Sequence, residues 1–338
     1  MPSHSPVRRH LLLAMPALLL ARRARAAPEG FGPALERAAA LPQLRTLIVA
    51  RGGETVVERR FGGPPPERPA NVKSVSKAVI AALVGAAIAR GVLEGTEQRI
   101  APLLRARLPR AADPRLEEIT IGHLLSMQAG LERTSGAHYG AWVSSRDWVR
   151  AALARPFAAD PGGPMLYSTG NSHLLSAILT LRAGRSTLAL AREWLGTPLG
   201  IEIPPWPRDP QGIYFGGNDM LLSPRALLRL AEMHRQGGQW QGRAVLAAEW
   251  VRACWTPRTR SVFTGDAHGY GWFLDRPGGE ARAYAWGYGG QMVHVLPRLG
   301  ASIVMTSDPD QPSGGASGHA RALHALVEEM LIPALRAA

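Results

Sequence analysis

Lysine is nearly absent from this sequence: only two of its 39 basic residues are lysines, and the other 37 are arginines. Both lysines, Lys73 and Lys77, lie in the short stretch PANVKSVSKAVI. Arginine keeps its proton in proteins, whereas a lysine that is desolvated near other cations can release it. We therefore interpret Lys77 as a position where the amine serves as a base. Lys73 fits a residual cation at the surface or beside the site.

Cysteine is equally scarce, because Cys254 is the only one, and it cannot form an internal disulfide. It lies in the helix-like stretch EWVRACW, which indicates a small core residue. The metal-binding patterns HExxH and CxxC are also missing, and a single cysteine does not build a metal site. We expect neither a metal nor another cofactor.

Only one long apolar run occurs, Leu11 to Ala21, and it is about half of the roughly 20 residues that a membrane span needs. Arg8-Arg9 precedes the run, and the small residues of Ala24-Arg25-Ala26 follow it. This order predicts an export signal over residues 1–27, of the twin-arginine type rather than the Sec type. We expect a periplasmic or secreted protein with no stable membrane span after the signal is removed.

Acidic residues are fewer than basic ones, and the net charge is +13. Five of the arginines that contribute to this positive charge lie within residues 1–27. No basic run and no interleaving of basic with aromatic residues marks a nucleic-acid groove. The sequence therefore argues against a nucleic-acid partner and favours a small-molecule one.

The first part of the chain after the signal reads as a hairpin followed by a helix. In TLIVARGGETVVERRFG, residues 46–62, two β-branched runs flank Arg51-Gly52-Gly53. From Val75 the apolar spacing becomes helical, with Val79, Leu83, Val84 and Ile88 expected inward, and Gly91 ends the helix.

Helix patterns between Pro/Gly loops fill residues 101–255, and strand patterns return in HGYGWFL, ARAYAWGYGG, QMVHVLP and ASIVMTSD before a final helix near 318–335. Strands at both ends with helices between predict an α+β fold, in which both termini build one antiparallel sheet flanked by helices, with an inserted all-helical lobe. We expect a single domain over residues 28–338. Its α/β lobe should cover about 28–100 and 256–338, and its helical lobe about 101–255.

Ser74 and Lys77 form a Ser-x-x-Lys pattern at the predicted start of the first long helix. Residues three apart share one face of a helix, so the Lys77 amine can reach the Ser74 hydroxyl. The positive potential of the helix N-terminus favours an anion at Ser74 and lowers the pKa of a buried ammonium. The pair therefore indicates a serine nucleophile with a lysine base.

Five stretches occur in the order typical of one known family: SVSK, ITIGHLLSMQAGLE, MLYSTGNSHLLSAIL, MLLSPRALLRLAEMHRQGGQWQGRAVL, and HGYGWFL followed by WGYGGQMVHVLP. Over roughly residues 40–335 the chain resembles serine β-lactamase-like hydrolases, the fold shared by class C β-lactamases, DD-peptidases, related esterases and 6-aminohexanoate-dimer hydrolase. The resemblance implies a β-lactamase/transpeptidase-like form of the predicted fold. It also implies that Ser74 is the nucleophile, Lys77 its base, and Tyr167 the residue that passes the proton to the leaving group.

Two positions depart from the family pattern. The asparagine of its Tyr-x-Asn motif falls on Thr169, and Asn171 comes two residues too late. The third motif, Lys- or His-Thr-Gly in the lactamases, aligns with Gly287-Tyr288-Gly289 and leaves no cation at Gly287. Because that cation helps to hold a substrate carboxylate, its absence favours esters or amides that lack this carboxylate over β-lactams and D-alanyl peptides.

The substrate-binding wall is expected around Gly290 and Gln291, where a backbone N–H would complete an oxyanion hole with that of Ser74. Thr169 is expected in the same site, and Tyr214 at the pocket edge, because it follows a Pro-rich loop. No Gly-x-Ser-x-Gly elbow is present, so three histidines that could suggest a Ser-His triad are interpreted as structural: His173, His294 and His319.

Together these features indicate an exported serine hydrolase that forms an acyl-enzyme with small ester or amide substrates. A β-lactamase or D-alanyl peptidase is the alternative within the same class. A non-catalytic penicillin-binding or cell-wall recognition module is the alternative of another class, because Thr169 and Gly287 both depart from the family pattern.

Overall fold

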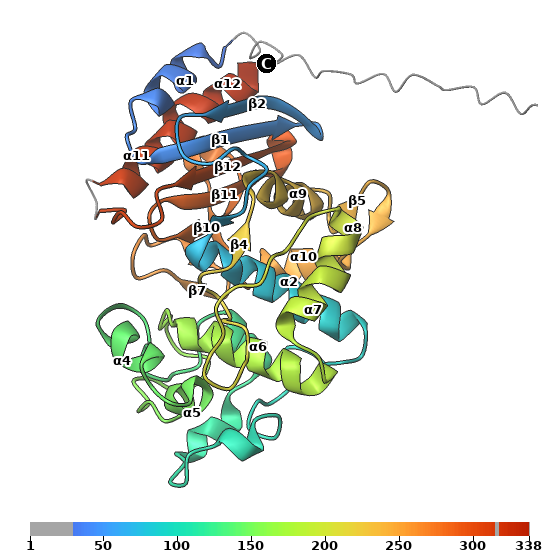
Figure 1. The fold of residues 1–338 in the computed structure, drawn as a ribbon, viewed down its shortest axis with the longest axis vertical. Coiled ribbons are helices and arrows are strands. Elements are labelled where there is room, and N and C mark those ends of the chain that lie inside the picture. The colour runs from blue at the N-terminus through green and yellow to red at the C-terminus, as the bar shows by residue number, and fades with distance from the viewer. Residues whose placement is uncertain (1–29, 315–317, 338) are drawn as a thin grey trace, which may run out of the picture.

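The computed structural model describes residues 30–314 and 318–337 of the chain. The predicted export signal, residues 1–27, lies outside the described residues. Within them, an eight-stranded antiparallel sheet carries helices on both faces, which confirms the predicted fold class (Figure 1).

The sheet joins the two ends of the chain. β1 (Leu44–Arg51) lies between β2 (Glu54–Arg60) and β12 (Ala301–Ser307), and its pairing with β12 runs from Leu44 opposite Ser307 to Arg51 opposite Ala301. The predicted hairpin is confirmed by the β1–β2 pair. The remaining strands follow in the order β11 (Gln291–Leu296), β10 (Arg282–Gly287), β9 (Phe273–Asp275), β8 (Ala267–His268) and β7 (Thr259–Arg260).

Successive residues of β1 pack into different hydrophobic clusters, as the period of two in a strand requires. Leu47 and Val49 join the cluster formed with the two terminal helical segments, whereas Ile48 and Ala50 join the cluster around the helix that follows Ser74. The sheet therefore separates two cores. The terminal layer consists of α1 (Gly32–Ala39), α11 (His319–Ala325), the π-helical segment Leu326–Leu331 and α12 (Ile332–Ala337).

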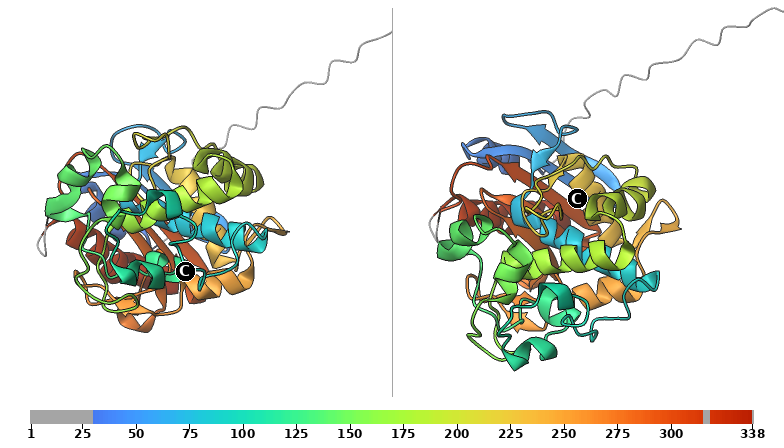
Figure 2. Two further views of the ribbon diagram at one scale, coloured as in Figure 1. Left: turned by 90° about the horizontal axis from the view of Figure 1, so that it is seen from below. Right: turned by 60° about the horizontal axis from the view of Figure 1, so that its bottom comes forward.

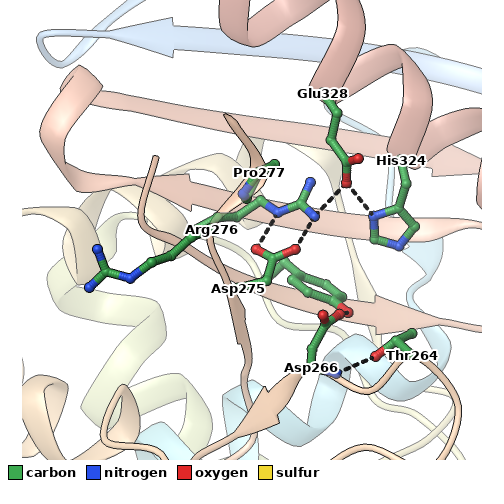
Figure 3. A pocket seen from close by; sticks show the side chains of 9 residues that line it. Thr264, Asp266, Asp275, Arg276, Pro277, His324 and Glu328 are labelled. Carbon is green, nitrogen blue, oxygen red and sulfur yellow. Dashed lines mark hydrogen bonds and ion pairs between the residues drawn. The ribbon is translucent and has the colours of Figure 1, made fainter. Parts of the chain in front are cut away.

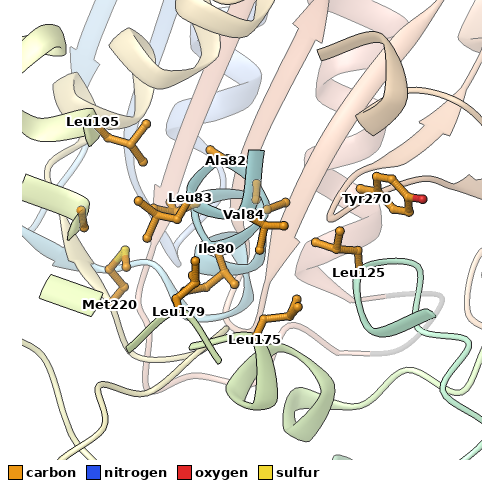
Figure 4. Packing of buried hydrophobic residues seen from close by; sticks show 14 of the residues in the cluster. Ile80, Ala82, Leu83, Val84, Leu125, Leu175, Leu179, Leu195, Met220 and Tyr270 are labelled. Atoms are coloured by element: carbon orange, nitrogen blue, oxygen red, sulfur yellow. The ribbon is translucent and has the colours of Figure 1, made fainter. Parts of the chain in front are cut away.

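On the other face, α2 (Ser76–Ala89) passes between the sheet and the helical lobe (Figure 2). It is buried all round, from Ser76 to Ala87, and not only along the predicted inward stripe. Figure 4 shows Ile80, Leu83 and Val84 of this helix surrounded by side chains from several elements. Because side chains pack against α2 on all sides, its first turn has little freedom to move.

The helical lobe lies beyond α2 and begins after residue 100 (Figure 1). No single helix among the described residues has the length and apolar composition of a membrane span, although two segments that meet at 85°, Thr169–Ala183 and Thr187–Leu199, reach them together. The helices are α3 (Ile121–Leu125), α4 (Tyr139–Val143), α5 (Trp148–Leu153), α6 (Thr169–Ala183), α7 (Thr187–Ala191) and α8 (Thr197–Leu199), with short 3₁₀ turns at Arg105–Arg107, Pro114–Glu118 and Gly136–His138 and a π turn at Arg192–Gly196.

The predicted end of this lobe at residue 255 is too late. α9 (Pro224–Arg235) packs against β11 and β12 and so belongs with the sheet. Its apolar spacing predicts a helix but carries no information about which surface covers its apolar face. The segment also contains α10 (Ala248–Cys254) and the small strand pair β5 (Gln239–Trp240) with β6 (Arg243–Ala244). Its strand β4 (Leu221–Leu222) pairs with β3 (Ala70–Asn71), which precedes α2.

Candidate active site

The predicted nucleophile and base lie together at the start of α2. Ser74 is in a 3₁₀ turn, Lys73–Val75, which leads directly into the helix, and Lys77 follows one turn later. The Lys77 Nζ atom is 3.1 Å from the Ser74 Oγ atom. When the amine is neutral, this contact allows the Ser74 hydroxyl to donate its proton to it.

The environment of Lys77 disfavours a charge. The residue is 5% exposed, and Nζ donates to the Gly217 carbonyl at 2.6 Å and to the Thr169 hydroxyl at 3.3 Å. No carboxylate of the described residues is in contact with Nζ. Burial lowers the pKa of Lys77 to about 7, and the negative charge of Asp219 opposes this shift from a distance. A large fraction of Lys77 is thus neutral near pH 7, as a base must be.

Tyr167 lies on the other side of the same pair. Its ring is 5.0 Å from Lys77 Nζ, and it precedes α6, as the sequence predicts. Burial raises the pKa of Tyr167 to about 12, against the opposing effect of a hydrogen bond with Ser74. At neutral pH almost all of this phenol keeps its proton, so it is suited to donate a proton and not to act as the first base.

Thr169, which was predicted to bind substrate or the oxyanion, contacts the base Lys77 through its hydroxyl. A second hydroxyl, that of Ser135, lies 3.0 Å from the Thr169 Oγ1 atom and accepts the backbone N–H of Thr169 at 2.9 Å. Ser135 thereby fixes the position of the Thr169 hydroxyl. Ser135 was not predicted to be in the site, because no spacing pattern connects a loop serine with a lysine 58 positions earlier.

The other lysine holds the backbone before the nucleophile. Lys73 and Asp219 are joined by an ion pair of 3.1 Å, and both have positive φ, +49° and +53°, a region that costs free energy for residues other than glycine. Asn71 bridges them, since its side chain accepts the Lys73 N–H and donates to the Asp219 carboxylate. Lys73 is therefore a cation beside the site.

The part of the strand edge that approaches the nucleophile lies three residues earlier in the chain than predicted, at Gly287 instead of Gly290. A Cβ atom on Gly287 would lie 3.0 Å from the Ser74 backbone nitrogen and 2.6 Å from the Val72 carbonyl, so β10 touches the nucleophile at Gly287. The corresponding Cβ on Gly290 would meet His319 and Leu323 instead.

Gln291 likewise lies away from the nucleophile. Its side chain is fully buried and bridges the backbone of Ser307, and the backbone N–H of Gly290 donates to the Gly287 carbonyl at 3.2 Å. By sequence, either Gly287 or Gly290 could lie at the strand edge that faces Ser74. Only the register of the strands distinguishes the two positions.

Tyr214 is also misplaced by the sequence analysis. Its ring packs 4.7 Å from that of Trp206 in the core of the helical lobe and does not line the cavity at Ser74. The Pro-rich loop before Tyr214 favoured a position at the edge of the pocket, but packing against Trp206 buries the ring.

The three histidines are structural, as predicted. None of them contacts Ser74. His173 pairs with the buried carboxylate of Asp209, His319 hydrogen-bonds Ser307, and His294 lies in a stack with Tyr284. Cys254 is fully buried, as the sequence indicated.

A cavity of about 210 Å³ opens at Ser74, and none of its eight lining residues is charged. A second hollow, of about 390 Å³, is lined by charged side chains, including Asp266, Asp275, Arg276 and Glu328 (Figure 3). Ser74 does not line the second hollow. The chemistry of the nucleophile is therefore confined to the uncharged cavity, whose lining residues are Ser74, Tyr167, Phe263, Phe273, Trp286, Gly287, Tyr288 and Ser313.

This fold, with a serine and a buried amine meeting at the first turn of its central helix, defines a serine hydrolase. A family model described as Beta-lactamase matches residues 43–328. The chain therefore belongs to the β-lactamase family.

Solved structures agree with this assignment. A protein assigned as a 6-aminohexanoate-dimer hydrolase from Bacillus anthracis has a TM-score of 0.72 at 17% identity, covering 87% of this chain and 79% of that one. EstCE1, a hydrolase with promiscuous acyltransferase activity, has a TM-score of 0.70 at 18% identity, covering 87% and 94%. A class C β-lactamase from Rhodobacter sphaeroides has a TM-score of 0.66 at 15% identity, covering 90% and 99%. No curated protein sequence matches the chain.

Proposed function

We propose that this protein hydrolyses small neutral esters or amides through an acyl-enzyme on Ser74. One observation carries the proposal: a buried amine with a pKa of about 7 lies 3.1 Å from a serine hydroxyl that opens into a cavity. A lysine kept only for structure would be expected to hold its charge with a carboxylate partner.

In the proposed acylation step, Ser74 attacks the substrate carbonyl and its proton passes to Lys77. The backbone N–H groups of Ser74 and Tyr288, on either side of the close approach at Gly287, hold the oxyanion. Tyr167 donates its proton to the leaving group and recovers one from Lys77. Water then attacks the acyl-enzyme, Lys77 accepts its proton, and the proton returns to Ser74 Oγ as the acid leaves.

The lining of the cavity supports neutral substrates. No lysine or arginine is among the described residues that line it, so a substrate carboxylate would lose its water without gaining a cation. This supports esters and amides ahead of β-lactams and D-alanyl peptides, although the family includes enzymes that act on the latter.

A fluorophosphonate probe tests the proposal most directly. Covalent labelling of the wild type, lost in Ser74→Ala, is expected, together with faster hydrolysis of 4-nitrophenyl acetate than of nitrocefin. A folded wild type that is neither labelled nor active would show a non-catalytic binding module, and fast nitrocefin turnover would refute the substrate preference.

We also propose that the protein is exported through the twin-arginine route. The support is the sequence alone: Arg8-Arg9, the short apolar run after it, and the small residues before position 27. Fusion of residues 1–30 to a reporter should deliver it across the membrane, and Arg8→Lys with Arg9→Lys should abolish delivery. Unchanged delivery by the double variant would instead indicate the Sec route.

A further inference from the structure

The uncharged cavity at Ser74 is built mainly from aromatic rings. Five of its eight lining residues are aromatic, and the others are two serines and Gly287. The Ser313 hydroxyl already accepts the backbone N–H of Gly289, so it is partly satisfied within the protein. The polar groups best placed for a substrate are therefore those of the reaction itself, Ser74 and Tyr167.

The rings form a slot beside Tyr167. Phe273 lies nearly parallel to the Tyr167 ring, with centroids 6.5 Å apart and 20° between the planes. Phe263 stands across it, at 5.8 Å and 81°. Such an arrangement presents both ring faces and ring edges, and a ligand ring placed against it gains stacked and edge-to-face contacts together.

The mouth of the cavity exposes apolar side chains within the described part of the chain. Of the four large apolar side chains exposed among the described residues, Phe263 and Tyr288 line the cavity and Val262 is next in sequence to Phe263. Phe263 is 54% exposed and Tyr288 is 52% exposed. An exposed apolar cluster at a catalytic serine indicates a surface that substrate covers.

Phe263 is held in place although it is exposed. The Ser261 hydroxyl accepts the backbone N–H groups of Phe263 and Thr264, at 3.1 and 3.2 Å. Tyr284 donates to the Asp266 carboxylate at 2.6 Å and anchors the other end of the loop, where Asp266 and Thr264 are also hydrogen-bonded (Figure 3). A preformed wall loses little entropy when a ligand binds.

The volume sets the size of the ligand group. A dry apolar cavity of about 150 Å³ holds one benzene molecule, and this cavity has about 210 Å³. One six-membered ring with its attachment to the scissile carbonyl therefore fits, whereas two fused rings do not fit inside it completely.

We propose that the cavity at Ser74 binds a single neutral ring, aromatic or of similar size and apolarity, carried by the substrate next to the scissile bond. This inference rests on the proposed hydrolysis at Ser74 and narrows its substrate class. The ring belongs either to the acyl group or to the leaving group of the substrate. The aromatic, uncharged lining of the cavity would bind it in the same way in both cases.

Three esters measured by pH-stat distinguish these two positions: ethyl acetate, ethyl phenylacetate and benzyl acetate. We expect kcat/KM to be roughly 10- to 100-fold higher for one ring-bearing ester than for ethyl acetate, as the burial of one ring predicts. A gain for ethyl phenylacetate places the ring in the acyl group, and a gain for benzyl acetate places it in the leaving group. Equal values for all three esters overturn the inference.

Charge on the ring provides a second measurement. We expect a 4-carboxylate on the ring to remove the gain, because the cavity has no cation to receive it. Phe263→Lys places one there and should narrow the difference between the neutral and the carboxylated ester. Equal turnover of both esters by the wild type would overturn the requirement for a neutral ring.

Phe263→Ala is expected to lower kcat/KM for the preferred ring ester by roughly tenfold, because it removes one wall. Leu181→Ala is the matched control, since Leu181 is 50% exposed and does not line the cavity. An effect of Leu181→Ala equal to that of Phe263→Ala would overturn the role of the wall. Fluorophosphonate labelling of Ser74 is recorded in parallel: labelling without a ring preference defeats only this inference, and no labelling defeats the proposed function as well.

Discussion

Two basic side chains among the described residues, those of Lys77 and Arg282, are buried, and they differ in the groups that contact them. Lys77 is 5% exposed and Arg282 is 3% exposed. Arg282 forms ion pairs with Asp275 and Glu328, whereas the contacts of Lys77 Nζ are hydroxyl and carbonyl oxygens.

The two surroundings move the two pKa values in opposite directions. Burial lowers the pKa of Arg282, but the hydrogen bonds and charges of Asp275 and Glu328 outweigh this and leave it raised. For Lys77, burial prevails and lowers the pKa to about 7. Burial alone thus does not make a base. What makes Lys77 one is burial without a carboxylate in contact, at a residue whose proton can be lost.

Replacement of the base tests this comparison with the largest expected effect. Lys77→Arg places a group of permanent charge beside Ser74, and we expect kcat/KM to fall by about 10²- to 10⁴-fold, the usual contribution of a general base. Activity on the preferred ester and the melting temperature are measured together. Full activity in a folded variant would remove Lys77 from the mechanism.

Replacement of Arg282, the ion-paired cation, should lower the stability of the fold. Arg282→Met leaves two carboxylates without their partner, and because Glu328 is 39% exposed we expect a loss near the lower end for such pairs, about 3 kcal/mol of unfolding free energy. Urea unfolding measures this loss. Arg276→Met, at an exposed neighbour, is the control and should change little. A stability equal to that of wild type would mean that the pairing contributes no net stability.

A carboxylate introduced beside Lys77 would give its amine an acidic partner, as Arg282 has. Thr169→Asp puts an acid in contact with Nζ, which should raise the pKa of Lys77 by about 1–3 units. Because only the neutral amine is a base, a shift of this size should lower activity at pH 7 by about 5- to 500-fold, and activity should return as the pH is raised. Thr169→Asn separates charge from size and should keep the acidic limb of the rate profile near pH 7. The same limb in both variants would contradict the comparison.

The distant acid should have the smallest effect. Asp219 raises the pKa of Lys77 against the effect of burial, so Asp219→Asn should lower that pKa further. The acidic limb of kcat/KM, where Lys77 loses its proton, should then move to lower pH. Asp147→Asn is a control, since Asp147 pairs with Arg107 away from Ser74. A limb that moves to higher pH would refute the assignment of this limb to Lys77.

Local sequence patterns predicted most of the strands and helices of the fold. The β-branched runs around Gly52-Gly53, the strand patterns near the C-terminus and the helix after Ser74 are all confirmed, because hydrophobic period and turn residues act locally. The placement of α9 against the sheet was not predictable in this way, since packing partners are decided by tertiary contacts between distant segments.

The same limit applies to the site. Ser74, Lys77 and Thr169 were found because a helix turn or a motif connects them, whereas Ser135 reaches Thr169 only through tertiary structure. The oxyanion wall was predicted around Gly290 and Gln291, whereas the residue of this edge that approaches Ser74 is Gly287, because glycine content does not reveal which residue of an edge approaches another segment.

The position of β12 between β1 and β11 has a consequence for biosynthesis. Residue 44 cannot meet residue 307 until residue 307 has been synthesised and has left the ribosome, and such distant pairing is slow to form. β1 therefore waits for β12, the last strand of the sheet. A nascent chain should consequently be inactive as a hydrolase, and premature termination before residue 301 should yield no partially working enzyme.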